Sequence, residues 1–319
     1  MHPLQLILFT LLLLLPLKPA KGKPVKLSGW IETGLKATPS GESFSGGRVK
    51  IKTKRKMGAR GVLSYEANTS ETSSLKDAYI DYKLDDSQKV QMGQAKKRFG
   101  YEYDTGKLKR LAIKRSPLYR KLETFSYVGR EMVFRYEKEA ESYHLDLSMG
   151  YNETQDAHFL SHYKWLISPK DSLSAFLLLQ SDVIFEGRQN VFAVDFSYSH
   201  KGETTSALFE LLGGIDPDAS QVEKLYYQGE TIYFWGAKWQ QGFRLENEKT
   251  TLFYQLTYIA HDTKEKEDNT LAGLLGVNHL ITPHLQAALN LTFEGERTKE
   301  DSKRDFYRSG GAFEVRLKL

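Results

Sequence analysis

The sequence predicts an all-β fold, a transmembrane antiparallel β-barrel of sixteen strands, or of fourteen if the ambiguous stretch 225–246 holds fewer strands. Three observations predict it. Apolar and polar residues alternate with a period of two along the chain, the connections between these segments are alternately short and long, and the last residues alternate as well. A barrel with lipid outside and water inside requires this alternation in every strand.

The composition is compatible with such a barrel. The chain has 319 residues, 45 Lys and Arg against 40 Asp and Glu, 12% aromatic residues and no Cys. The lack of Cys excludes a disulfide scaffold and a Cys-ligated metal site, and the aromatic content argues against a disordered chain. A mean hydropathy of −0.48 resembles that of a soluble protein. A polar lumen and an apolar outer band average to the same value, however.

The first element is an apolar run at residues 4–17, followed by the small residue Ala20. The run is shorter than the ~20 residues that a membrane-spanning helix needs. We therefore expect a cleaved signal peptide at residues 1–22 and a single outer-membrane barrel domain at residues 23–319. A membrane anchor that stays on the mature protein is the alternative for this run.

The strands follow from the alternation. In one of them Phe192, Val194 and Phe196 form an apolar face, while Asp195 and Ser197 lie on the other. The pattern continues beyond the roughly seven to nine strands at which a soluble sandwich normally ends. The candidate strands lie near residues 25–37, 47–54, 59–69, 75–84, 89–99, 125–137, 142–151, 158–167, 172–182, 190–200, 204–213, 230–241, 249–261, 270–281, 284–295 and 307–319.

The connections alternate in length. Every second gap is a short turn, with the sequences KRKMG, LDDSQ, EKEAE, SPKD, SHKGE, RLENEK and TPH. Most of the others are longer, and the longest is the third loop at about residues 100–124. Outer-membrane barrels have tight periplasmic turns and longer outer loops, whereas a soluble sandwich has no reason to separate loop lengths in this way.

The carboxyl end, GAFEVRLKL, is an alternating segment that stops on its apolar phase. It resembles the terminal insertion signal of outer-membrane barrels, although Leu319 stands where that signal usually has Phe. The resemblance implies that the barrel-assembly machinery is a partner of the chain.

Residues 75–118 resemble the phosphate-selective porin O and P family, in which a DAYIDY strand, a short turn and a strand ending near GQFKxPFG lead into a long third loop. Residues 46–68 are similar in layout to the second hairpin of that family. Lys96, Phe99 and Gly100 match the motif, while Ala95 and Arg98 depart from it. The resemblance implies a bacterial outer-membrane porin, a third loop that folds into the barrel, and a homotrimer.

The lumen of so wide a barrel holds water, so inward charges set selectivity without destabilising a core. Strand phase and the basic third loop predict that cations line the pore and bind anions, and arginine suits bidentate contact with phosphate or carboxylate. The expected residues are Arg48, Lys50, Lys52, Arg60, Lys96, Lys109, Arg110, Lys114, Arg115 and Arg135.

Each of these assignments has an alternative. The cations at residues 107–115 could bind lipopolysaccharide phosphates on the outer surface, and Lys52, Lys54 and Lys56 could be turn charges at the periplasmic rim. Asp77 and Asp81 share the inward phase and could neutralise part of the cationic strand. Anion selectivity is therefore inferred from clustering, because a net charge of +5 would not establish it.

The sequence thus predicts an outer-membrane porin for passive, anion-preferring diffusion of small solutes such as phosphate, in contact with outer-membrane lipid and lipopolysaccharide. We expect no catalytic residue, cofactor or nucleic-acid partner. We also expect no metal site, because His158 and His162 are four residues apart on a predicted strand and do not converge. The alternative is a barrel hydrolase using Ser161, His162 or Asp195, or a plugged structural or adhesin barrel.

Overall fold

The structure is a computed structural model. It describes residues 26–37, 44–57, 59–68, 71–105, 110–113, 115–125, 127–151, 157–184, 187–217, 220, 231–246, 248–263, 268–297 and 309–318. Side chains are described from residue 77 onwards, except at 182–184, 187–189 and 316–318. The expected signal peptide at residues 1–22 lies outside the described residues.

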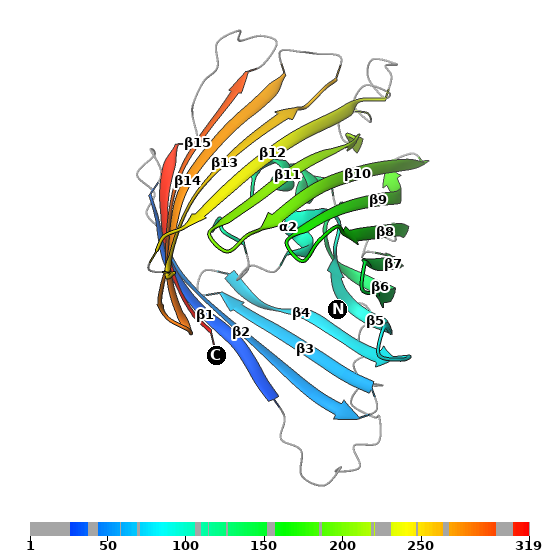
Figure 1. The fold of residues 1–319 in the computed structure, drawn as a ribbon. Coiled ribbons are helices and arrows are strands. Elements are labelled where there is room, and N and C mark those ends of the chain that lie inside the picture. The colour runs from blue at the N-terminus through cyan, green and yellow to red at the C-terminus, as the bar shows by residue number, and fades with distance from the viewer. Residues whose placement is uncertain are drawn as a thin grey trace.

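The described strands form one closed barrel in which each strand is antiparallel to its neighbours in the sequence and β1 pairs with β16 (Figure 1). The predicted all-β antiparallel barrel is therefore confirmed. The strands are β1 (Lys26–Ala37), β2 (Phe44–Met57), β3 (Ala59–Asn68), β4 (Glu71–Lys83), β5 (Gln88–Lys97), β6 (Gly129–Glu139), β7 (Tyr143–Tyr151), β8 (Ala157–Leu166), β9 (Asp171–Ile184), β10 (Gly187–Lys201), β11 (Thr205–Ile215), β12 (Tyr233–Arg244), β13 (Thr250–Ala260), β14 (Asn269–Thr282), β15 (Leu285–Arg297) and β16 (Gly310–Lys318).

The two faces of the strands differ as the alternation predicts. On β10, Phe192 and Phe196 are exposed on the outer face, while Ala193 and Asp195 are buried on the inner face. Large apolar side chains on the outer face of most other strands with described side chains are exposed in the same way. Such a surface is stable only against an apolar surrounding, which is the condition in a bilayer.

No helix among the described residues is long and apolar enough to cross a membrane.

One end of the barrel carries short turns, at residues 84–87, 140–142, 167–170, 202–204, 245–249 and 283–284. In the first of these, an Asp85 carboxylate oxygen accepts hydrogen bonds from the backbone N–H groups of Ser87 and Gln88, each at 2.7 Å. A hydrogen bond from the Ser87 hydroxyl, together with these backbone bonds, lowers the pKa of Asp85. Aspartate favours tight turns because it can bond its own backbone in this way.

The opposite end carries the connection from β5 to β6, and we call its described residues, 98–105, 110–113, 115–125 and 127–128, the inward segment. It contains helices α2 (Tyr101–Asp104) and α3 (Pro117–Thr124) and lies within the ring of strands (Figure 1). Pro117 begins α3, a position that needs no backbone donor. The apolar side of the segment packs on the inner wall of β8 to β13, in a buried cluster of Phe99, Tyr103, Leu118, Tyr119, Leu122, Phe125, Tyr127, Val128, Leu160, Phe176, Leu178, Val191, Ala193, Leu212, Ile215, Phe234 and Ile259.

Candidate functional site

The inward segment is fastened to the barrel wall by a buried ion-pair network. Lys238 on β12 and Glu210 on β11 are directly opposite in register and their charged groups are in contact. The Lys238 ammonium also lies 2.8 Å from a carboxylate oxygen of Glu102 in α2. A buried lysine facing two carboxylates compensates charges that would otherwise be costly to remove from water.

The Tyr119 hydroxyl is the second fastening point. It lies 3.1 Å from Asp195 Oδ2, contacts the Glu210 carboxylate, and accepts a 3.0 Å hydrogen bond from the Glu102 N–H. Burial, with the negative charges of Asp195 and Glu210, raises the pKa of Tyr119 well above its ordinary value, so the hydroxyl keeps its proton. The proton can then be donated to one of the two carboxylates.

Gly100 allows this close approach. Its φ of 76° lies in the left-handed region, and a Cβ atom there would stand 2.2 Å from the Tyr119 hydroxyl oxygen. Glycine is the residue that meets both demands. The match of Gly100 to the family motif thus has a physical reason in this chain.

Four cations gather around Tyr103 of α2, and we call them the basic cluster: Lys96, Arg110, Arg115 and Arg130. The Lys96 ammonium contacts the Tyr103 carbonyl oxygen and lies 4.3 Å from the centre of its ring, and the Arg115 guanidinium lies 4.0 Å from the same centre. Arg110 and Arg130 are close enough to act electrostatically on the Tyr103 hydroxyl. This cluster includes three of the predicted site residues.

The cations of the basic cluster differ in their counter-charges. Arg115 contacts the Glu123 carboxylate, and Arg130 lies 3.0 Å from Asp77 Oδ1. The contacts of Lys96, by contrast, are with a neutral carbonyl and an aromatic ring. Neither of these two contacts supplies a counter-charge to Lys96.

Arg135 lies on the inner face of β6, as its phase predicts, but its side chain is only 1% exposed. The guanidinium lies 3.2 Å from Asp146 Oδ1, donates a 2.7 Å hydrogen bond to the Lys96 carbonyl, and also donates to Gln91. Neighbouring Arg98 bridges Glu137 at 3.2 Å and Asp146 at 3.5 Å. Arg135 therefore braces the wall and presents little surface to a solute.

The remaining predicted residues are placed by register or lie outside the described part. Arg60 pairs with Asp81, which is buried on the inner face. Glu314 of β16 is buried on the inner face and is opposite Gly34 of β1. Glu32 is two residues from Gly34 on the same strand and therefore shares its face, and Arg48 of β2 is opposite Glu32. Because alternate residues share a face, Arg48, Lys50 and Lys52 belong to the inner face of β2. Lys109 and Lys114 lie outside the described residues.

The predicted inward acids lie where their phase puts them. Asp77 and Asp81 are both buried on the inner face of β4. Asp77 pairs with Arg130, and Asp81 accepts a 2.9 Å hydrogen bond from Gln91. Asp77 therefore contacts β6 and Asp81 contacts β5, in addition to the register pairing of Asp81 with Arg60.

The residues of the proposed hydrolase alternative do not form a catalytic group. Ser161 and His162 are adjacent on β8, so their side chains point to opposite faces of the barrel wall. The Asp195 carboxylate is bonded to Tyr119 in the fastening network. A nucleophile and its base must be within hydrogen-bond reach, which this arrangement does not provide.

Sequence reasoning missed Glu102, Tyr119, Glu210 and Lys238. A usable signal was present for two of them: Glu210 is the single charge in the apolar stretch ALFELLGG, and Lys238 is the single charge in FWGAKW. An isolated charge on an inner face needs a partner. Its identity depends on strand register, which the alternation does not specify.

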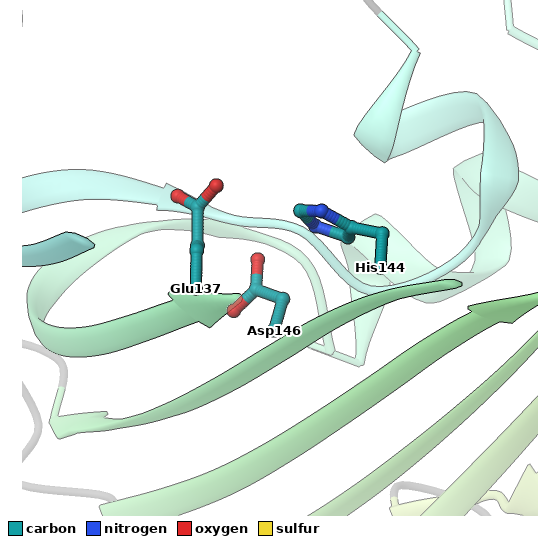
Figure 2. Close-up of side chains that lie close together, drawn as sticks. All are labelled: Glu137, His144 and Asp146. Atoms are coloured by element: carbon teal, nitrogen blue, oxygen red, sulfur yellow. The ribbon is translucent and has the colours of Figure 1, made fainter. Parts of the chain in front are cut away.

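Two groups of side chains in the described residues could hold a metal ion. The first is Glu137, His144 and Asp146, and the second is His261, Asp268 and Glu296. In each group the ligand atoms lie within 4.8 Å of one another. The first group lies on β6 and β7 inside the barrel (Figure 2).

Comparison with known proteins gives one family match. The sequence profile of the family phosphate-selective porin O and P matches residues 48–172. This confirms the resemblance carried by residues 46–68 and 75–118. No curated protein matches the chain by sequence.

The structure is similar to solved porin structures. OmpT, an outer membrane protein of Vibrio cholerae, has a TM-score of 0.66 at 10% identity, covering 95% of this chain and 100% of that one. An anion-selective porin from Comamonas acidovorans has a TM-score of 0.65 at 11% identity, covering 93% and 99%. A mutant of Rh. blastica porin has a TM-score of 0.58 at 12% identity, covering 93% and 100%. Similarity at such low identity establishes the fold.

Proposed function

We propose that the chain is an outer-membrane porin through which small anions, such as phosphate or small carboxylates, diffuse passively. The family match over residues 48–172 and the porin-like fold support a channel. The Comamonas acidovorans protein of similar fold is described as anion-selective, which supports an anion preference here. We further propose secretion by a signal peptide at residues 1–22, assembly by the barrel-assembly machinery, contact with lipopolysaccharide, and a homotrimer.

The observation that carries the proposal is the placement of the basic cluster. The fastening network holds the inward segment against one side of the wall, and the same segment brings Tyr103 to Lys96. The basic cluster, with the guanidinium groups of Arg110, Arg115 and Arg130 beside Lys96, thereby lies inside the barrel. A charge in a narrow channel with low-dielectric walls raises the local concentration of the opposite ion.

The second source of positive charge is the inner face of β2. Arg48, Lys50 and Lys52 occupy alternate positions there. The inward segment contacts β10, β11 and β12 through the fastening network, and it contacts β14 and β15 through Asn278 and Glu294. A path bordered by the basic cluster and by β2 would therefore have cations on two sides, the arrangement typical of anion-preferring pores.

Single-channel recording in planar bilayers tests the proposal. Purified protein whose folding is verified by heat-modifiable migration should give discrete conductance steps in potassium chloride. Liposomes containing the protein should also swell in isotonic solutions of small anions. An absence of steps from folded protein would contradict the porin and favour a plugged barrel.

A further inference from the structure

Glu137, His144 and Asp146 converge on the inner wall of the barrel, at the hairpin formed by β6 and β7 (Figure 2). Glu137 and Asp146 are directly opposite in register, and His144 is two residues from Asp146 on the same face. We propose that this part of the wall binds a divalent transition-metal ion of the zinc class, with Glu137, His144, Asp146 and His162 as ligands.

His162 supplies the independent observation. It is directly opposite Asp146 on the neighbouring strand β8, so a row of inward side chains runs from Glu137 through Asp146 to His162. The His162 ring is 2% exposed, and neither of its nitrogens has a hydrogen-bond partner among the described residues. A buried imidazole without a partner is costly, and a metal ion that takes one of its nitrogens relieves that cost.

The spacing fits one ion. Zinc binds nitrogen and oxygen at about 2.0–2.2 Å, which places tetrahedral ligand atoms roughly 3.4 Å apart. The ligand atoms of Glu137, His144 and Asp146 already lie within 4.8 Å of one another. The ring centres of His144 and His162 are 5.8 Å apart, close to the ~5 Å that two imidazoles on one zinc ion adopt at these bond lengths. His162 is outside this group of ligand atoms, so binding of the ion requires movement of the His162 side chain as well as displacement of Arg98.

The His162 ring is already held in a fixed plane. It stacks on Phe176, with ring centres 3.8 Å apart and planes at 11°. Aromatic packing on one face of an imidazole limits its rotation and leaves the ring edge, where both nitrogens lie, to be used. A fixed ligand loses less conformational entropy when an ion binds.

Cations already occupy part of this site. The Arg98 guanidinium bridges Glu137 and Asp146, and the Lys89 ammonium lies 2.7 Å from Glu137. Both side chains are partly exposed, 28% for Arg98 and 34% for Lys89, so both can turn toward lumen water. Arg135 stays in place because Gln91 and the Lys96 carbonyl also hold it. The metal ion therefore competes with Arg98 for the same two carboxylates.

This competition connects the site to the inward segment. Arg98 is the first residue of that segment and directly precedes Phe99, which is anchored in the apolar cluster. An ion that replaces Arg98 releases its guanidinium, while the rest of the segment keeps its packing. The histidine spacing that argued against a metal site concerned His158 and His162 on one strand, whereas this site joins residues of three strands through their register.

Cobalt and zinc ions test the proposal on the folded, full-length protein in detergent. We expect Co²⁺ to give visible absorption bands of imidazole and carboxylate coordination, and Zn²⁺ to abolish them. His144→Ala and His162→Ala should each weaken Zn²⁺ binding at least tenfold in calorimetric titration, in line with the affinity cost of disturbing a metal site. Arg98→Gln should tighten binding about tenfold, because it removes the competing cation.

Two control variants locate the binding. His284→Ala changes an exposed turn histidine, and His261→Ala changes the second group of potential ligands. Both should leave the Co²⁺ bands unchanged. An absence of Co²⁺ bands in the wild type would overturn the proposal. So would bands that are lost in His261→Ala but retained in His144→Ala and His162→Ala. Tighter binding by Arg98→Gln would also show that this variant is folded, since a misfolded barrel would not bind the ion more tightly. Unchanged Zn²⁺ affinity in Arg98→Gln would refute the competition between Arg98 and the ion.

Discussion

Lys238 on β12 and Glu102 in α2 are separated by 136 residues in the sequence, yet the lysine Nζ lies 2.8 Å from the Glu102 Oε1 inside the barrel. Both side chains are buried, and Lys238 also contacts Glu210 on the neighbouring strand. One ammonium group thus joins two strands of the wall to the inward segment. It acts on the segment together with the buried apolar cluster and the ion pair of Arg120 with Glu294.

Replacing Lys238 with methionine should loosen the inward segment. The change leaves the carboxylates of Glu102 and Glu210 buried without their cation, and breaking a buried pair in this way costs about 3–5 kcal/mol. We expect the segment to become sensitive to limited proteolysis and the channel current to become noisier. Lys170→Met, in an exposed turn, is the control and should match the wild type. Equal protease resistance in the two variants would refute the fastening role.

Gly100→Ala should disturb the same contact from the backbone side. A side chain at this φ of 76° and ψ of 156° costs about 1–3 kcal/mol, and its Cβ would displace the Tyr119 hydroxyl. Hydrogen exchange of residues 98–128 should therefore be roughly tenfold faster or more. Gly273→Ala is the matched control, because the nearest atom to its added Cβ is a Leu256 methyl carbon at 3.9 Å. Equal exchange in the two variants would contradict the account.

Leu256→Arg tests the assignment of the outer face to lipid. Leu256 in β13 and Leu84 in a turn are both 53% exposed, so they differ in depth and not in accessibility. Arginine at the middle of a bilayer costs a membrane barrel about 2–4 kcal/mol, and near an interface about 0–1 kcal/mol. Urea titration of folding into lipid vesicles should show the larger loss for Leu256→Arg. Equal losses in Leu84→Arg would place the outer face of β13 away from the bilayer core.

Lys96→Gln should shift ion selectivity toward cations. The substitution removes the lysine amine from the basic cluster, while Arg115 and Arg130 keep their carboxylate partners. The reversal potential in a potassium chloride gradient should move toward the cation value. Lys170→Gln removes a charge from an exposed turn and should leave the potential unchanged. An identical potential in both variants would place Lys96 outside the conduction path.

The strands could be predicted because the surroundings of a barrel wall fix the alternation directly. On β10 the exposed Phe192 and Phe196 and the buried Asp195 follow from the period of two alone. The position of Arg135 on the inner face followed from the same rule. Its burial against Asp146 did not, because that contact depends on the pairing of β6 with β7.

The fastening network could not be predicted for a related reason. Glu210 and Lys238 are adjacent only through the register of β11 with β12, and Glu102 reaches them only once the inward segment is packed. A shift of one residue in register would move every side chain of a strand to the other face. The register between two strands is therefore set by the packing of the whole barrel. The same limit hid the convergence of Glu137, Asp146 and His162, which belong to three strands.

The reversal potential of the wild-type protein in a potassium chloride gradient tests the central claim most directly. The basic cluster and the inner face of β2 are expected to favour chloride over potassium, so the potential should have the sign of an anion-preferring pore. The preference should weaken as salt concentration rises, because screening shortens the reach of the charges. A potential of the cation-preferring sign at low salt would contradict the account.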